Sequence, residues 1–216
     1  MFKGSSGELS GSITPIQVSK MERLMYTTFL NNISKFTTLT EEEQSLFTDM
    51  LDLRYIPKKT TLLREGEICQ FEGYIQKGCV RIYYMNENGC EVTLCFAVEN
   101  WWVCDIDSFY ERKPSIFFIE TLEATEMYVF TPETKEKLLS TIPKFERVFR
   151  LLVQRNLSAV QKRLVTTISK TATERYLEFI KMYPSLPLRV PQYYIASYLG
   201  ISPEFISTIR KRLSSK

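Results

Sequence analysis

The chain has 216 residues, of which 44% are hydrophobic and 25% are charged, so it can bury a core as one large domain or two small ones. It contains no histidine, which excludes His-based catalytic triads, the common zinc sites and histidine proton shuttles. No apolar run approaches the roughly 18 residues of a membrane span and no signal peptide is visible, so we expect a cytoplasmic protein with no membrane partner.

The net charge of +3 hides an asymmetry along the chain. Residues 1–132 hold 12 Lys and Arg against 19 Asp and Glu, whereas residues 133–216 hold 16 against 6. The first part therefore has a net charge of −7 and the second a net charge of +10. A basic C-terminal part indicates a module that faces a polyanion, although a solvated basic helix surface would give the same balance.

The five cysteines all lie between Cys69 and Cys104, and none forms a Cys-x-x-Cys pair. We expect reduced thiols in the core of a cytosolic protein and no metal site, because no spacing supports a cluster held by Cys alone. Residues 4–12 are rich in Gly and Ser, so residues 1–20 are predicted to be a flexible or appended segment ahead of a native start near Met21.

In chain order, the first predicted elements are two helices between Lys20 and about Leu53, where apolar residues recur at helical spacing. Thr40 precedes three glutamates, which is typical of the start of a helix. Short segments rich in β-branched and aromatic residues follow, separated by turn signals. The predicted strands are residues 55–57, 60–63, 71–76, 80–85, 92–98, 117–121 and 127–130, a density that favours a small barrel or roll.

Helical spacing returns after Pro132, first at residues 133–140 and then over about seven turns from Pro143 to Ser169. A helix of this length with one apolar stripe usually packs against a partner, so we predict a homodimer through Pro143–Ser169. Packing on its own domain would also explain the stripe. Thr171–Tyr183 is the next predicted helix, and a connection marked by proline leads from it to two short helices.

The segment Gln192–Leu213 has the spacing of a helix-turn-helix. In its first helix, Ile195 and Leu199 face inward and Ala196 is the small residue where the second helix crosses. Gly200 is predicted to form the turn, because one residue there favours a left-handed backbone.

In the second helix, Ser202 is the predicted cap and Pro203 the first helical position, while Ile201, Ile206 and Ile209 return to the core. The polar and basic residues that this pattern leaves outward are predicted to bind DNA through base edges and phosphates. Their set is Ser202, Glu204, Ser207, Thr208, Arg210, Lys211 and Arg212.

The chain resembles the Crp/Fnr family of bacterial regulators in the order of its elements: a strand-rich domain, a long amphipathic helix and a C-terminal helix-turn-helix. Within the resemblance, which covers about Phe29 to Leu213, Lys58–Glu67 looks like a family segment, and Tyr74–Arg81 looks like the family's hydrophobic-x-x-Gly-x-Val-Lys/Arg strand pair. The resemblance implies an α+β fold: an N-terminal antiparallel β-roll of jelly-roll type, a long dimerisation helix and a C-terminal helix-turn-helix domain.

The resemblance also implies a division of the chain into a β-roll effector domain at 21–142, a dimerisation helix at 143–169 and a DNA-binding domain at 170–216. The expected partners are double-stranded DNA with two-fold symmetry, a second copy of the chain and RNA polymerase. We expect a sequence-specific transcription regulator and not an enzyme, since no nucleophile–base pair or phosphate loop appears. A small-molecule-binding module whose helix-turn-helix no longer binds DNA is the alternative.

The family's cyclic-nucleotide cassette is degenerate in this sequence. Cys104 stands in place of its glycine, Asp105 in place of its glutamate, and Ser115 in place of the arginine that meets the phosphate. A cyclic phosphate needs a partner for its charge, whereas Asp105 and Asp107 repel it. These two acids could be a remnant of the cassette, hold a different ligand, or belong to a solvated loop, and the loop is the favoured interpretation. We therefore expect no cyclic AMP. With no histidine and no cysteine before Cys69, we also expect none of the haem or iron–sulfur cofactors of sensing family members, and we leave the effector open. The candidate pocket residues are Trp102, Cys104, Asp105, Ser115 and Ile116.

The predicted recognition helix also departs from the family. Many members begin it Ser-Arg-Glu and place a second arginine four residues after the glutamate. Here Glu204 is kept, but Pro203 and Thr208 stand in place of the two arginines, so the operator is expected to differ. No β-hairpin wing follows in this sequence, and Arg189 or Lys170 is expected to supply further contacts with the DNA backbone.

Overall fold

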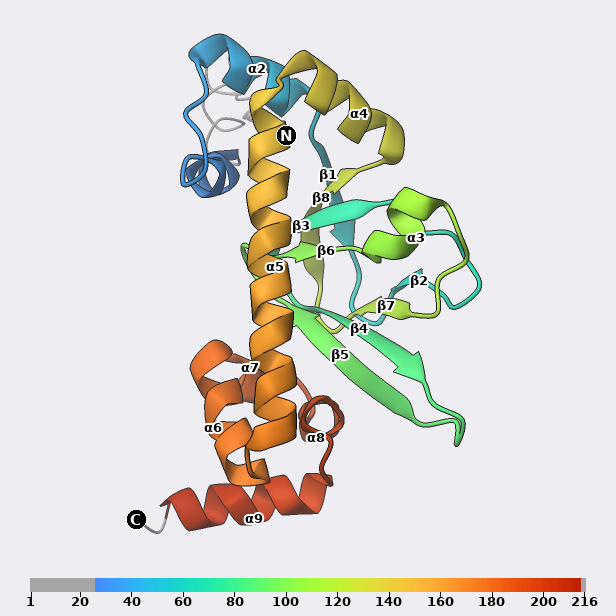
Figure 1. Cartoon of the computed structure of the whole chain (residues 1–216), viewed down its shortest axis with the longest axis vertical. Coiled ribbons are helices and arrows are strands. Elements are labelled where there is room, and N and C mark those ends of the chain that lie inside the picture. Colours follow the sequence, from blue (N-terminus) through green and yellow to red (C-terminus); the bar gives the residue numbers. More distant parts are fainter. Residues whose placement is uncertain (1–25, 215–216) are drawn as a thin grey trace, which may run out of the picture.

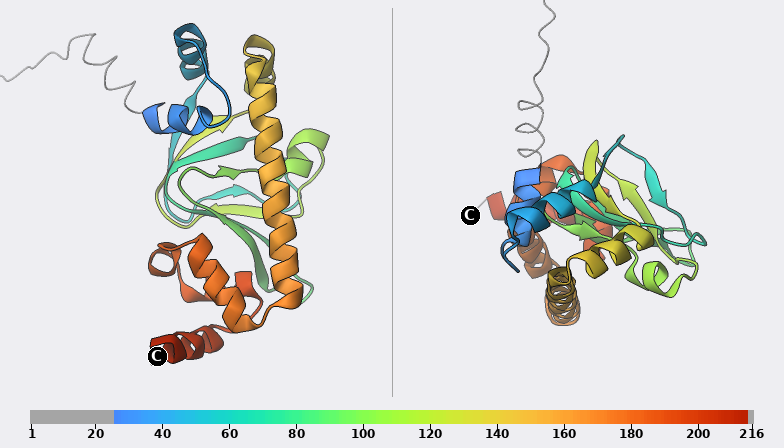
Figure 2. Two further views of the ribbon diagram at one scale, coloured as in Figure 1. Left: turned by 60° about the vertical axis from the view of Figure 1, so that its left-hand side comes forward. Right: turned by 90° about the horizontal axis from the view of Figure 1, so that it is seen from above.

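The computed structural model describes residues 26–214, which are arranged along the long helix α5 (Lys144–Ser169; Figure 1). A β-roll lies beside α5 along most of its length, and four further helices gather at its lower end. Figure 2 shows the same arrangement from two other sides. The predicted flexible segment at residues 1–20 lies outside the described residues.

The two predicted N-terminal helices are confirmed where the structure describes them, as a helix at residues 26–33 and as α2 (Glu41–Asp49). Thr40 caps α2 as predicted: its hydroxyl accepts from the amide of Glu43, and its own amide donates to the Glu43 carboxylate at 2.8 Å. Phe29 is fully buried and its ring stacks on Tyr74 of the roll, with centroids 4.0 Å apart. These helices are therefore part of the roll's core.

Two four-stranded antiparallel sheets form the roll, which confirms the predicted fold class. One has the order β1-β8-β3-β6 and the other β2-β7-β4-β5, so β5 lies at an edge. The strands are β1 (Asp52–Ile56), β2 (Thr61–Leu63), β3 (Glu72–Lys77), β4 (Val80–Met85), β5 (Glu91–Ala97), β6 (Trp102–Val103), β7 (Phe118–Thr121) and β8 (Thr125–Phe130).

Two elements of the roll were absent from the sequence prediction. One is the two-residue strand β6. The other is the short helix α3 (Ile106–Glu111), whose N-cap is Asp105. Neither is long enough to show a period, which is why the apolar pattern does not reveal them. The segment with Asp105 and Asp107 is therefore the start of a helix and not a solvated loop.

Five helices besides α5 make up the C-terminal half: α4 (Pro132–Thr141) before it, then α6 (Ala172–Met182), α7 (Leu186–Arg189), α8 (Gln192–Leu199) and α9 (Pro203–Ser214). The sequence predicted all of them except α7, which was expected to be a connection. An apolar cluster joins α6–α9 to the roll, and in it Phe96 of β5 contacts Phe179 and Tyr183 of α6. The helix-turn-helix region is thus packed against the roll.

The five cysteines are all free thiols, as predicted. Cys69 and Cys79 are buried, but Cys90 is exposed in the turn between β4 and β5, so it is not a core residue. Among the described residues, no helix is both long and apolar enough to cross a membrane. The same residues bring together no group of three or more Cys, Asp and Glu that could hold a metal ion.

Two of the roll's glycines with positive φ have different surroundings, which predicts different costs of substitution. Gly78 (φ +109°) has a Cβ position 2.8 Å from the Thr125 backbone, whereas Gly89 (φ +71°) has open space around it. Gly89→Ala should lower the free energy of unfolding by about 1 kcal/mol through backbone strain alone. Gly78→Ala should cost about 3 kcal/mol or more, because a steric clash adds to the strain. Chemical denaturation measures both, and equal losses would contradict the assigned clash.

Candidate nucleic-acid interface

The predicted turn of the helix-turn-helix is present. Gly200 ends α8 in the left-handed conformation, at φ 65° and ψ 40°. The amide of Ile201 then donates to the carbonyl of Ala196 at 3.1 Å, which closes the end of the helix. Ala196 is 1% exposed, as a residue at a close helix crossing must be.

The second helix, α9, starts where the sequence predicted. The hydroxyl of Ser202 accepts a hydrogen bond from the amide of Phe205 at 3.2 Å, which satisfies one of the free amides at the start of the helix. Ile206 and Ile209 are each 1% exposed and lie in the same apolar cluster as Ile195. These contacts fix the outward face of α9.

All seven residues predicted to bind DNA are exposed, and α9 lies at the end of the molecule remote from most of the roll (Figure 1). Hydrogen bonds from its own amide and from Ser202 lower the pKa of Glu204, so this side chain is a carboxylate at neutral pH. An exposed carboxylate near the start of the helix and basic residues near its end can meet base edges and phosphates, respectively.

Gln192 is a further residue of this surface that the sequence did not single out. Its side-chain amide reaches across from α8 to α9, donating to the carbonyl of Pro203 at 2.6 Å and to the hydroxyl of Ser207 at 2.9 Å. Gln192 therefore orients Ser207 on the outward face. Its place at the first position of α8 was visible in the sequence, but nothing there indicated its partner.

Two of the candidate effector residues bind each other. The Asp105 carboxylate accepts from the hydroxyl of Ser115 at 2.6 Å and from the amide of Ser108 at 3.3 Å, where it caps α3. Asp105 is 6% exposed and Ser115 is 3% exposed. Asp107 is exposed and pairs with Lys113 at 2.9 Å. The acid that stands in place of the family's glutamate is thus already satisfied within the protein.

The other three candidates have contacts of their own. Trp102 packs in the aromatic core, with its ring centroid 5.4 Å from that of Phe149 on α5, while Ile116 is 65% exposed. The Cys104 thiol donates a hydrogen bond to Cys69, and this bond is the main cause that lowers the pKa of Cys69 to about 7. The sequence thus grouped residues that serve separate structural roles.

Arg189 is not available for the DNA contact that the sequence suggested. Its guanidinium pairs with Glu99 at 2.7 Å and with Glu123 at 2.6 Å, both on the roll. Two carboxylates on one guanidinium leave no net positive charge there for a phosphate. Lys170, the other suggested residue, pairs with Glu178 at 3.1 Å near the surface.

Residues 53–141 match the family model described as the cyclic nucleotide-binding domain. The structure of FixK2 from Bradyrhizobium japonicum is similar, with a TM-score of 0.67 at 17% identity over 76% of this chain and 85% of that one. A Crp/Fnr-family transcriptional regulator from Eubacterium rectale gives a TM-score of 0.61 at 18% identity, over 82% of this chain and 84% of that one. The chain has the Crp/Fnr fold.

The c-di-GMP-responsive global regulator CLP from Xanthomonas campestris shares this fold, with a TM-score of 0.64 at 18% identity over 82% of this chain and 92% of its own. The comparison with curated proteins found no match. The predicted resemblance to the Crp/Fnr family is therefore confirmed for the fold of the chain and for the nucleotide-binding-type roll.

Proposed function

We propose that this protein is a sequence-specific DNA-binding transcription regulator. The observation that carries the proposal is the helix-turn-helix, whose second helix buries Ile206 and Ile209 and exposes Glu204, Thr208 and Lys211 on the opposite face. A basic C-terminal half and a fold shared with transcription regulators agree with it. RNA polymerase is a partner expected of such a regulator.

The regulator acts as a homodimer through α5. Large apolar side chains form a stripe on this helix that the rest of the described chain leaves at least 49% exposed: Val153, Leu157, Val160, Leu164 and Ile168. Their spacing of three or four residues keeps them on one face, as in the seam of a coiled coil. A second copy of α5 would remove this stripe from water, and two-fold symmetry would then place two recognition helices on one duplex.

Cyclic AMP is not the effector in this proposal. The place of the family's phosphate-binding arginine is taken by Ser115, whose hydroxyl already donates to Asp105. A cyclic phosphate at this place would meet the buried carboxylate of Asp105, and neither Asp105 nor Ser115 can supply a positive charge. Without the bidentate arginine, the negative charge of the phosphate has no partner.

Substitutions on the outward face of α9 should affect two different properties, the general affinity for DNA and the preference for particular bases. Lys211→Ala should weaken binding to any duplex and reduce the slope of log K against log salt by about one per protomer. Glu204→Ala should instead relax the preference for one base pair by about 1–3 kcal/mol, since the carboxylate accepts from cytosine. Mobility shifts and selection from random duplexes measure both. The control Lys58→Ala, an exposed change on the roll, should alter neither; an unaltered selected site in Glu204→Ala would show that the reading face is misplaced.

Disruption of the α5 stripe should produce monomers. In Leu157→Glu/Leu164→Glu, two carboxylates per helix would face each other across the seam, and burying them unpaired is strongly unfavourable. Light scattering should show the 25.3 kDa chain mass in place of twice that value. Ser158→Glu, which lies off the stripe, should remain dimeric. A double variant that stays dimeric would exclude α5 as the interface.

Calorimetric titration with cyclic AMP or cyclic GMP should give no saturable heat up to about 1 mM ligand. The expected reason is the missing cation at the cassette, where Ser115 and Asp105 bind each other. DNA affinity measured with and without these nucleotides is the matching functional control and should be unchanged. Micromolar binding of either nucleotide would overturn this part of the proposal.

A further inference from the structure

Among the polar contacts that join the helix-turn-helix region to the roll, which also include a hydrogen bond from Tyr183 to the Phe96 carbonyl, we call three sets the docking interface. The first is Arg189 of α7, which binds both oxygens of Glu99 at 2.7 and 2.8 Å and both oxygens of Glu123 at 2.6 and 3.1 Å. It also donates to the carbonyl of Gly78 at 3.1 Å. A planar guanidinium bound by two carboxylates fixes direction as well as distance.

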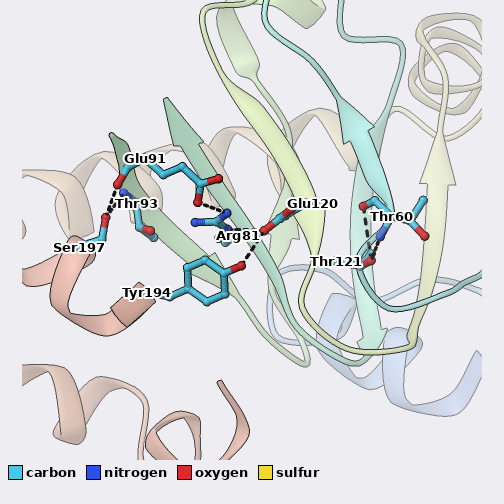
Figure 3. A network of polar contacts seen from close by, with 8 residues as sticks. All are labelled: Thr60, Arg81, Glu91, Thr93, Glu120, Thr121, Tyr194 and Ser197. Atoms are coloured by element: carbon cyan, nitrogen blue, oxygen red, sulfur yellow. Dashed lines mark hydrogen bonds and ion pairs between the residues drawn. The ribbon is translucent and has the colours of Figure 1, made fainter. Parts of the chain in front are cut away.

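The second contact set joins α8 to the edge strand β5. The Ser197 hydroxyl donates to the carbonyl of Glu91 at 2.7 Å and accepts from the amide of Thr93 at 2.9 Å (Figure 3). The register of β5 against β4 shifts between Thr93 and Cys95, because these two residues pair with the consecutive residues Tyr83 and Ile82. This shift is a β-bulge. Ser197 therefore binds backbone groups of a strand that lies at the edge of its sheet, with no second neighbouring strand within residues 26–214.

The third contact set lies around Arg81 of β4, whose side chain is 1% exposed. Its guanidinium pairs with Glu91 and Glu120 at 2.5 Å each and lies 3.8 Å from the centre of the Tyr194 ring (Figure 3). The Tyr194 hydroxyl is 3.5 Å from the Glu120 carboxylate. Tyr194 of α8 thus covers a buried charge of the roll.

By contrast, the chain link between α5 and α6 is short and non-helical. Lys170 ends α5 in an extended conformation, and Thr171 caps α6 directly after it. A link of two non-helical residues would allow the helix-turn-helix to rotate about the end of α5, so contacts outside the link must define the direction of α9. The docking interface supplies such contacts, together with Arg163 of α5, which donates to the Tyr198 carbonyl of α8 at 3.2 Å.

We propose that the docking interface fixes the recognition helix relative to the dimer axis, and so makes DNA binding depend on one half-site spacing. Arg189, Ser197 and Tyr194 are then positioning residues that never touch DNA. The proposal rests on the proposed dimeric DNA-binding function. Each inserted base pair moves one half-site by about 3.4 Å and rotates it by about 35°, a change that a fixed pair of helices cannot follow.

The test uses the full-length dimer and duplexes that carry two half-sites from the pool selected by the wild type, with zero to three base pairs inserted between them. The wild type should lose about tenfold or more in affinity on insertion of two base pairs, because simultaneous engagement fails. Arg189→Gln should lose about threefold or less, since its recognition helices can reorient. Affinity for a single half-site should stay the same in both.

Glu123→Gln, a change on the roll alone, should flatten the spacing profile as Arg189→Gln does, and the double variant should add nothing further. Lys181→Gln on the exposed surface of α6 removes the same charge and should keep the wild-type profile. Ser197→Ala is the milder second variant if Arg189→Gln unfolds. In Ser197→Ala without DNA, the Thr93 amide loses its acceptor, so it should exchange its hydrogen faster than in the wild type.

Folded Arg189→Gln and Ser197→Ala proteins that retain the wild-type spacing profile would overturn the inference and leave the proposed function intact. A wild type that binds no duplex at any spacing would instead overturn the proposed function and this inference with it. A flattened profile accompanied by an equal loss of single half-site affinity would also count against the inference, because it would indicate damage to α9 itself.

Discussion

The burial of one charge, that of Arg81, organises the contact between the two halves of the molecule. A guanidinium cannot be taken out of water unless carboxylates or other groups replace its solvation. Glu91 and Glu120 do so at 2.5 Å, and the centres of the Tyr83 and Tyr194 rings lie 3.9 and 3.8 Å from it. Burial lowers the pKa of Arg81, but the hydrogen bonds to these carboxylates outweigh it and raise the pKa overall. The charge is therefore permanent, and it needs its covering residue from α8.

The need to cover Arg81 links the edge strand β5, the helix α8 and the turn at Gly200. Tyr194 reaches Arg81 only while α8 lies along β5, and the Ser197 contacts with Glu91 and Thr93 hold α8 there. Since Gly200 sets the angle between α8 and α9, the direction of α9 follows from the position of α8. An apolar cluster that joins both halves provides the bulk of the burial, while the polar contacts select one orientation within it.

The sequence predicted the features that depend on residues close together in the chain. The cap at Thr40 and the left-handed turn at Gly200 each depend on residues within a few positions, and both are present. The role of Arg189 could not be predicted, because its partner Glu99 lies 90 residues away and no periodicity connects them. Trp102 shows the limit of the resemblance as well. Its position suggested a ligand pocket, but which face of a two-residue strand a side chain takes depends on the register with β3.

A second buried cation pairs with the other sheet of the roll. Lys135 of α4 is 3% exposed, pairs with Glu72 of β3 and lies 3.8 Å from the centre of the Phe149 ring on α5. Separating this lysine from its carboxylate would leave an unpaired buried charge, so α4 and the start of α5 must stay with β3. The roll is thus held to α5 by one buried cation and to α8 by the other. The direction of α9 relative to α5 is therefore set through the roll and through Arg163 of α5, which donates to the Tyr198 carbonyl of α8 at 3.2 Å, and the two-residue link at Lys170 need not carry it.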